Sequence, residues 1–450
     1  MPSTIRSLTS NPPAWPILGH THLFIRDKLE FLTRCQQKHG DTLRLKIGEP
    51  VWLLNNPADI QHILASNGRN YEKSPKLTSS RGRRLSGSGL LTATGKDHLP
   101  LRRQLQPLFR KPVVESHGDM IASLADRWIS RWKSGDEVDL LAEMMALSQQ
   151  VMIKALFGPD FEDNEGRFAA AVTTRRQYIE YFFTSNLPVP EYLPMPIVWR
   201  FSRARRYLHS VINDEIRKRR QGNGEPKGYL SMLINGRGRR DYALDDREVL
   251  DEAVTITSTG YETIGAALAW TIHLLAMHRQ ELLRIRQDVS GLAQNGPVDI
   301  AQLNSASSLE QAFNESLRLF PPTWIFVRVA NDDDLLPGGI KISAGDKIYI
   351  CPWTMHRNSS HYREPEKFNP CRFEQSEITN RHRFSFIPFG GGTKQCIGEP
   401  LARLEASIIL SRLIQNFDFE HCSAEEVKPR PSIVLEPDGG LPMRLVKANR

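Results

Sequence analysis

The chain has 450 residues, of which 40% are hydrophobic, and its formal net charge is +8 at pH 7. This length and apolar content suit one large globular unit, so we predict a single domain over residues 1–450. Lysine and arginine do not gather into a dense tail, which argues against nucleic acid as a partner.

The cysteines and the N-terminal residues predict a reducing, cytoplasmic setting. The five cysteines form no CxxC pair and their number is odd, so we expect no disulfide framework. The first residues contain no apolar stretch typical of a secretion signal. The best membrane-spanning candidate, 253–277, is interrupted by Gly260, Glu262 and several threonines. We therefore predict a buried helix there and no membrane anchor.

In chain order, the first elements expected are a proline-rich loop at 11–20 and a helix at 26–39. Alternating apolar residues predict paired strands at 42–47 and 51–55, and a proline opens a predicted helix over 57–66. Residues 74–94 are rich in Ser, Gly and Arg. We predict a long loop there, and long loops in compact domains are often functional.

Helical patterns dominate from about 97 to 320, with breaks at proline and glycine clusters. Short β-rich runs are expected at 325–330, 340–343 and 347–350. A last long helix is predicted over roughly 397–416, with strand-like pieces after it. The fold class predicted is therefore mainly α with a smaller β portion (α+β).

Three consecutive glycines, 390–392, precede Cys396, and the last predicted helix follows it. The free N–H groups and the dipole of a helix start favour a thiolate, which is a nucleophile or a metal ligand. Glycines also remove side chains that would keep a flat, bulky partner away from the sulfur. A buried structural cysteine is the alternative. A zinc site would need further Cys or His ligands at short spacing, and the sequence has none there.

Three other stretches bear on this cysteine. Glu315 and Arg318 share one helix face, although such a pair alone is more often an ordinary surface ion pair. Arg372 lies in Phe-Asn-Pro-Cys-Arg-Phe, and residues 259–263 read Thr-Gly-Tyr-Glu-Thr inside a predicted helix. With the loop Phe-Gly-Gly-Gly-Thr-Lys-Gln-Cys-Ile-Gly, and in this order, they resemble the cytochrome P-450 haem-thiolate monooxygenases. The resemblance runs from the proline-rich start to the final strands.

The resemblance implies the cytochrome P-450 fold, with haem b between the long central helix and the helix after the cysteine loop. Cys396 would be the thiolate ligand of the iron, which favours O–O cleavage. Lys394 stands where the family usually has Arg or His, and it offers a point charge without a bidentate fork. The cofactor-binding residues implied are His98, Arg102, Arg328, Phe389, Lys394, Cys396 and Gly398. For the cations among them the alternative is surface solvation.

The same resemblance assigns supporting and catalytic residues. Glu315, Arg318 and Arg372 would form a buried ion network that locks the cysteine loop. Thr263 would hydrogen-bond bound oxygen, and Glu262 would feed protons through water. The alternative for Thr263 is a hydrogen bond within its own helix.

Two neighbours bear on that oxygen site. Gly260 would leave room for dioxygen beside the helix. Thr259 departs from the family's usual alanine, and its hydroxyl could alter water order or crowd a substrate.

Substrate contacts are expected from the 74–94 loop and from the aromatic-rich residues 178–192, for which core packing is the alternative. The individual candidates are Thr259, Trp324, Ile325, Phe326 and Val434. The implied reaction is hydroxylation or epoxidation of a lipophilic small molecule with O2, such as a natural-product tailoring step or fatty-acid or terpenoid oxidation.

No GxGxxG motif follows a predicted strand, so electrons are expected from an acidic ferredoxin or flavodoxin with its NAD(P)H reductase. The basic surface expected for that docking contains Arg102, Arg103, Arg110, Lys111 and Lys394. We expect a monomer. Two alternatives stay open: a peroxide-driven haem-thiolate enzyme that needs no reductase, and a haem-binding sensor without catalysis.

Overall fold

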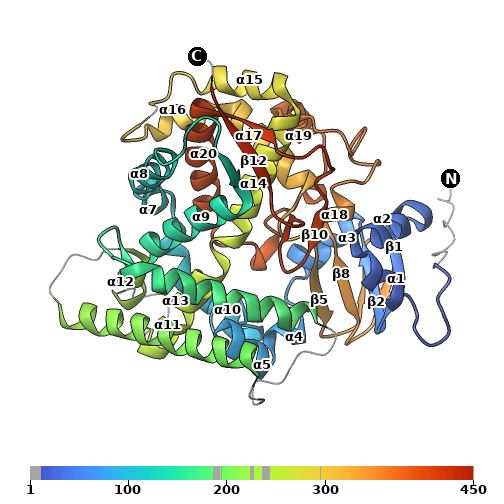
Figure 1. The fold of residues 1–450 in the computed structure, drawn as a ribbon. Helices are drawn as coiled ribbons and strands as arrows, with labels where there is room; N and C mark the ends of the chain where they lie inside the picture. The colour runs from blue at the N-terminus through green and yellow to red at the C-terminus, as the bar shows by residue number, and fades with distance from the viewer. Residues whose placement is uncertain are drawn as a thin grey trace. The chain divides into compact units, whose positions relative to one another are not determined.

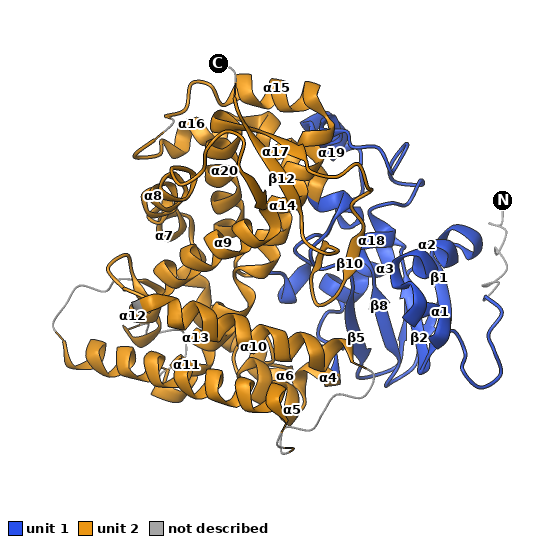
Figure 2. Cartoon of the chain, viewed as in Figure 1, with its two compact units in different colours: residues 1–74, 317–396 blue, residues 75–316, 397–450 orange. Residues whose placement is uncertain are grey.

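The computed structural model describes residues 12–185, 193, 195–222, 228–235, 244–293 and 295–448. The chain folds into two compact units, coloured separately in Figure 2. Unit 1 comprises Met1–Ser74 and Leu317–Cys396, and unit 2 comprises Pro75–Ser316 and Ile397–Arg450. The single domain over 1–450 stays a prediction. Within the aromatic segment proposed for substrate, residues 186–192 lie outside the described part.

Unit 1 is built on a five-stranded sheet with the strand order β1-β2-β8-β5-β3 (Figure 1). β2 and β8 run parallel, and the other neighbours run antiparallel. The strands are β1 Thr42–Ile47, β2 Glu49–Leu54, β3 Tyr71–Lys73, β5 Phe326–Ala330 and β8 Lys347–Ile350, with a separate pair β6 Asp334–Leu335 and β7 Lys341–Ile342. The helices are α1 Thr21–Arg26, α2 Lys28–His39, α3 Pro57–Gln61, α18 Pro352–Met355 and α19 Gln375–Thr379.

A π-helical turn, His62–Ser66, continues α3 and carries part of the core of unit 1. Ile63 and Leu64 of this turn are buried in one apolar cluster with sheet residues and with Phe384. The predicted helix over 57–66 is therefore confirmed, although its second half is π-helical.

Asp334 anchors the segment that follows this turn. One of its carboxylate oxygens accepts hydrogen bonds from Tyr71 Oη at 2.6 Å, from Asn67 Nδ2 at 2.9 Å and from the ring of His62 at 2.9 Å. Burial alone would raise the pKa of Asp334, but these hydrogen bonds hold it at about 2. The carboxylate therefore fixes residues 62–71 as a unit.

Unit 2 is mainly helical (Figure 1). In it α9 packs against α14, and α10 lies alongside α11. Its helices are α4 Pro75–Thr78, α5 Ser80–Ser86, α6 Gly95–Leu105, α7 Lys111–Glu115, α8 Gly118–Ile129, α9 Leu140–Phe157, α10 Arg167–Thr184, α11 Pro196–Gln221, α12 Gly228–Asn235, α13 Asp246–Thr259, α14 Glu262–Met277, α15 Arg279–Asp288, α16 Ile300–Ser305 and α20 Glu399–Asn416. α17 Ser307–Leu319 spans the boundary between the units. The strands are β4 Glu137–Asp139, β9 Phe417–His421 and β12 Pro442–Lys447 in one sheet, and β10 Pro429–Pro431 with β11 Leu435–Pro437.

The prediction of a long loop over 74–94 is wrong for its first half, which forms α4 and α5. Ser79 caps α5 by accepting the Gly82 N–H at 3.2 Å. Leu85 of α5 packs with Tyr178 and Phe182 of α10. Tertiary burial and a serine cap thus offset the poor helix propensity of this segment.

The helix predicted across 253–277 is not continuous. α13 ends at Thr259 and α14 begins at Glu262, with Gly260 and Tyr261 between them. Among the described residues, α9 is the one helix long and apolar enough to cross a membrane, and 61% of that stretch is buried inside the structure. A core helix passes the same test, so this finding is weak evidence for a span.

The Asp334 anchor predicts a pH-dependent stability. Because the folded pKa lies below the ordinary value, its stabilisation is complete above about pH 4 and is lost as the pH falls towards about 2. Asp334→Asn is expected to lower the free energy of unfolding at pH 7, and the gap to the native chain should narrow below pH 4. Urea unfolding at several pH values measures this. The exposed neighbour change Asp332→Asn is the control, and an equal loss in both variants would contradict the assignment.

Candidate active site

Cys396 lies on a tight loop that a backbone hydrogen bond closes. Its N–H donates to the carbonyl oxygen of Phe389 at 2.9 Å. Gly390 and Gly392, between them, have φ of +73° and +66°, a region that favours glycine. The Cys396 residue is exposed, and α20 begins three residues later, after Gly398. The predicted position of the cysteine just before the last helix is confirmed.

The glycines are also needed for close packing within unit 1. A Cβ on Gly391 would lie 2.8 Å from the ring of Phe384. A Cβ on Gly392 would overlap the carbonyl oxygen of Leu64 in the π-helical turn. Side chains at these two positions would push the loop off the core, so the sequence Gly-Gly-Gly sets how close the cysteine loop can lie to residues 62–66.

Lys394 fastens the loop to the same segment. Its ammonium donates to the carbonyl oxygens of Gly68 and Tyr71, each at 2.9 Å, and lies 4.0 Å from a carboxylate oxygen of Glu72. The side chain is only 7% exposed. The alternative that Lys394 is a solvated surface cation is therefore wrong. The prediction that Lys394 is part of an exposed docking surface is also wrong, because its amine points into the protein.

Arg328 of β5 adds a second buried cation in unit 1. Burial lowers its pKa to about 10, and the charge of Glu72 opposes that shift. Burial also lowers the pKa of Lys394; Glu72 offsets part of the shift, and Arg328 adds to it. Arg328 and Lys394 thus carry two positive charges beside one carboxylate, that of Glu72. Because one positive charge is not balanced by Glu72, the site favours a further anion.

In unit 2, the predicted cations His98 and Arg102 both lie on α6. His98 is buried and Arg102 is partly exposed. Arg103 is exposed, as are Arg110 and Lys111.

The break between α13 and α14 places the predicted catalytic pair at a helix start. Thr263 donates its hydroxyl to the carbonyl oxygen four residues back, that of Thr259, at 3.4 Å. This is the backbone contact that was the alternative, but here it crosses from α14 to the last residue of α13. A Cβ on Gly260 would run into the Met152 methyl group of α9. The space that a side chain at position 260 would take is therefore filled by α9, and room for dioxygen at Gly260 stays a prediction.

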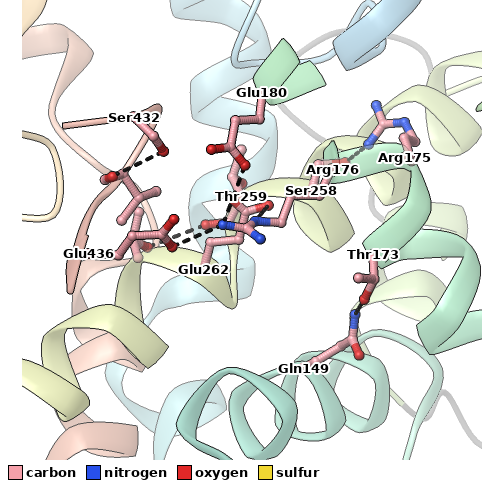
Figure 3. Close-up of polar contacts among 12 residues, drawn as sticks. Gln149, Thr173, Arg175, Arg176, Glu180, Ser258, Thr259, Glu262, Ser432 and Glu436 are labelled. Carbon is pink, nitrogen blue, oxygen red and sulfur yellow. Dashed lines mark hydrogen bonds and ion pairs between the residues drawn. The ribbon is translucent and has the colours of Figure 1, made fainter. Parts of the chain in front are cut away.

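Glu262 is buried, and its carboxylate lies 3.3 Å from Nε of Arg176 on α10 (Figure 3). Burial raises the pKa of Glu262, and the charge of Arg176 works against that rise. A carboxyl group with a raised pKa holds its proton closer to neutral pH, which suits a group that passes protons on.

A model of the family described as cytochrome P450 matches residues 10–441. The chain belongs to the cytochrome P450 family. It is 28% identical to pentalenene oxygenase of Streptomyces avermitilis, over 90% of both chains. It is 29% identical to cyclooctat-9-en-7-ol 5-monooxygenase of Streptomyces melanosporofaciens, over 89% of this chain and 87% of that one. The haem domain of cytochrome P450DA superposes with a TM-score of 0.86 at 20% identity, covering 98% and 97% of the two chains.

Membership of the cytochrome P450 family fixes the class of chemistry and the cofactor. The fold is the cytochrome P450 fold, mainly helical with a smaller sheet portion, as predicted. The protein is a monooxygenase, and the cofactor of the family is haem b. The described residues fit that group in two respects: the sulfur-bearing residue is exposed on a loop without bulky side chains, and buried cations suit the acidic groups of haem.

The ExxR pair of this cytochrome P450 is not on the surface, since Glu315 and Arg318 are both fully buried. Arg318 donates to three backbone carbonyl oxygens: His356 at 2.9 Å, Pro365 at 2.7 Å and Lys367 at 3.1 Å. It therefore holds the irregular stretch that leads to the cysteine loop. Arg372 donates to the Glu364 carbonyl oxygen at 2.9 Å in the same stretch. The three-residue ion network stays a prediction.

The substrate candidates of this cytochrome P450 differ in exposure. Trp324 and Val434 are buried, Ile325 and Phe326 are partly buried, and Thr259 is exposed. Phe326 packs against the core of unit 1, which is the core-packing alternative for that side chain. Their contact with substrate stays a prediction.

Sequence reasoning missed the partners of Glu262. Its direct partner is Arg176 on α10, which two other carboxylates share: Glu436 on β11 and Glu180 one turn further along α10. The residues from α10 and β11 lie far from Glu262 along the chain and belong to no motif, so only the fold brings them together.

Gly392 and Gly390 form a matched pair for testing the cysteine loop. Both have positive φ, but only Gly392 lacks space for a methyl group. Gly390→Ala is expected to lower the free energy of unfolding by about 1 kcal/mol, from the left-handed conformation alone. Gly392→Ala should cost about 3 kcal/mol, because backbone overlap adds to that strain. Urea unfolding measures both, and equal effects would contradict the packing of this loop.

Proposed function

We propose that this cytochrome P450 inserts one oxygen atom from O2 into a terpenoid, by hydroxylation or epoxidation, with electrons from a separate ferredoxin system. The observation that carries the reaction class is Cys396, exposed on its glycine loop just before α20. The substrate class is supported by the bacterial relatives, whose names specify pentalenene and cyclooctat-9-en-7-ol as what they oxidise.

Haem b would be held by residues that the sequence assigned. The Cys396 thiolate would bind the iron, with Phe389 and Gly398 beside it in the loop. The Arg328 guanidinium, and His98 and Arg102 of α6, would pair with the two propionates. Lys394 already donates to two carbonyl oxygens, so its part is mainly to hold the loop. When bound, the haem-thiolate group supplies the activation of dioxygen.

The chain's own residues would supply protons. Burial raises the pKa of the Glu262 carboxyl group and so favours a proton on its oxygen, while Arg176 opposes that rise. The Thr263 hydroxyl, one residue further, would receive that proton through water and present it to the oxygen site. For this the hydroxyl must leave the Thr259 carbonyl oxygen, to which its contact is long at 3.4 Å.

Electrons would arrive from an acidic ferredoxin or flavodoxin. Arg103, Arg110 and Lys111 are exposed cations in unit 2, and they suit such a partner. A peroxide-driven reaction would need neither this surface nor a proton-delivering acid. Glu262, a buried acid whose pKa is raised by burial, therefore favours the O2-dependent reaction.

The purified holoenzyme tests the proposal with a panel of cyclic terpene hydrocarbons and terpene alcohols. Binding of a fitting compound should shift the haem from low to high spin. Turnover with ferredoxin, reductase and NADPH under ¹⁸O2 should place one ¹⁸O atom in the product. Fatty acids of similar size serve as the comparison.

Two results would count against the proposal. Product formation from hydrogen peroxide alone, at the rate of the complete system, would support the peroxide-driven alternative. A holoenzyme whose spin state no apolar compound alters would support a sensor.

A further inference from the structure

Arg176 is shared by three carboxylates (Figure 3). Its Nη2 atom lies 3.0 Å from Glu436 and 3.8 Å from Glu180, and its Nε atom lies 3.3 Å from Glu262. The side chains of Glu262 and Glu436 are 9% and 3% exposed, so water screens these charges weakly.

The contacts of Arg176 are not equivalent. Nη2 donates a hydrogen bond to Glu436. Nε, which faces Glu262, is buried and has no hydrogen-bond partner among the described residues. The contact of Arg176 with Glu262, at 3.3 Å, is therefore longer and less well directed than its 3.0 Å hydrogen bond with Glu436, although it still lowers the pKa of Glu262.

The position of Glu436 is set by the β10–β11 hairpin. Arg430 on β10 pairs in register with Glu436 on β11 and binds its carboxylate. Arg430 also donates to Glu180 at 2.7 Å, which ties the hairpin to α10. Trp270 of α14 donates to the Leu435 carbonyl oxygen at 3.0 Å. The hairpin is thus held to α10 and α14, the helices that carry Arg176 and Glu262.

The charges in this cluster are unequal. Three carboxylates, Glu180, Glu262 and Glu436, meet two guanidinium groups, Arg176 and Arg430. Among these directly ion-paired groups, one carboxylate is therefore in excess. Because Glu436 and Glu180 share Arg430 as well as Arg176, Glu262 is the one with the weaker pairing.

Two further ionisable groups act on Glu262: the Tyr261 hydroxyl lowers its pKa, and Arg175 attracts its charge. Arg175 is fully buried and attracts Glu262 through space, but it donates to the Ser258 hydroxyl and the Leu85 carbonyl oxygen. Tyr261, next to Glu262 in the chain, has its own pKa raised by burial, so it stays neutral near pH 7.

We propose that Glu436 is a positioning residue for proton delivery: by taking the hydrogen bond of Arg176 Nη2, it keeps Arg176 from fixing Glu262 as a permanent carboxylate. Glu262 can then hold a proton and release it. The inference rests on the proposed proton role of Glu262. It adds Glu436, a residue distant from Glu262 along the chain, which sets how readily Glu262 holds its proton.

Two substitutions move the protonation of Glu262 in opposite directions. Glu436→Gln removes a negative charge that competes with Glu262 for Arg176. Arg176 then stabilises the Glu262 carboxylate more strongly, so the pH midpoint of Glu262 protonation should fall by about one pH unit. Arg430→Gln leaves Glu436 and Glu180 to compete harder for Arg176, so the midpoint should rise. That rise should be smaller, because the Arg430 side chain is 43% exposed.

The midpoint is read from the infrared band of the protonated Glu262 carboxyl group, assigned by difference from Glu262→Gln holoenzyme. Glu425→Gln, an exposed change in the same C-terminal segment, should leave it unchanged. The pH profile of NADPH-driven turnover should shift in the same sense as the band. If the β10–β11 hairpin had only a structural role, Glu436→Gln and Arg430→Gln would both loosen it. The midpoint of Glu262 protonation would then shift in the same direction in both variants.

An unchanged or raised midpoint in Glu436→Gln would overturn the proposal. If that variant does not fold, Arg430→Gln decides alone, and a midpoint that does not rise overturns it. Failure of the proposed function looks different: Glu262→Gln would then turn over as the native enzyme does, while the infrared midpoints would still respond to Glu436.

Discussion

The structure depends on how the cysteine loop is held. Cys396 is exposed, yet the loop behind it is closely packed, since Gly391 and Gly392 lie against Phe384 and Leu64. Lys394 fastens the same loop to carbonyl oxygens of residues 68 and 71. A sulfur on a closely packed support would meet a cofactor at low entropic cost, because the loop conformation exists before the cofactor binds.

Behind this loop lies a chain of fixed contacts within unit 1. The loop packs on the π-helical turn, and the Asp334 carboxylate holds that turn through three side chains. Arg318, fully buried, orders the irregular stretch before the loop through its bonds to backbone carbonyl oxygens. Buried polar groups such as Asp334 and Arg318 favour a single conformation of the backbone when their hydrogen bonds are all made. Losing some of those hydrogen-bond partners lowers the free energy of unfolding.

The elements of the fold and the site that could be predicted from the sequence are those that local sequence patterns determine. The cysteine loop, the last helix and the strands expected at 42–47, 325–330 and 347–350 follow from glycines and alternation. They are confirmed, the second strand as β5 Phe326–Ala330. α5 was missed, because its stability comes from packing of Leu85 on α10. The break at Gly260 was missed as well, although glycine and threonine were recognised there as poor helix formers. The partners of Glu262 could not be predicted, since tertiary contacts alone join Arg176 and Glu436 to it.

The carbon monoxide complex of the reduced holoenzyme tests the central claim most directly. Sulfur ligation by Cys396 predicts a strongly red-shifted Soret band in the native protein, and loss of that band in Cys396→Ser. A protein that stays colourless when supplied with haem would contradict the account. So would a Soret band at the unshifted position in the native chain, or a red-shifted band that persists without Cys396.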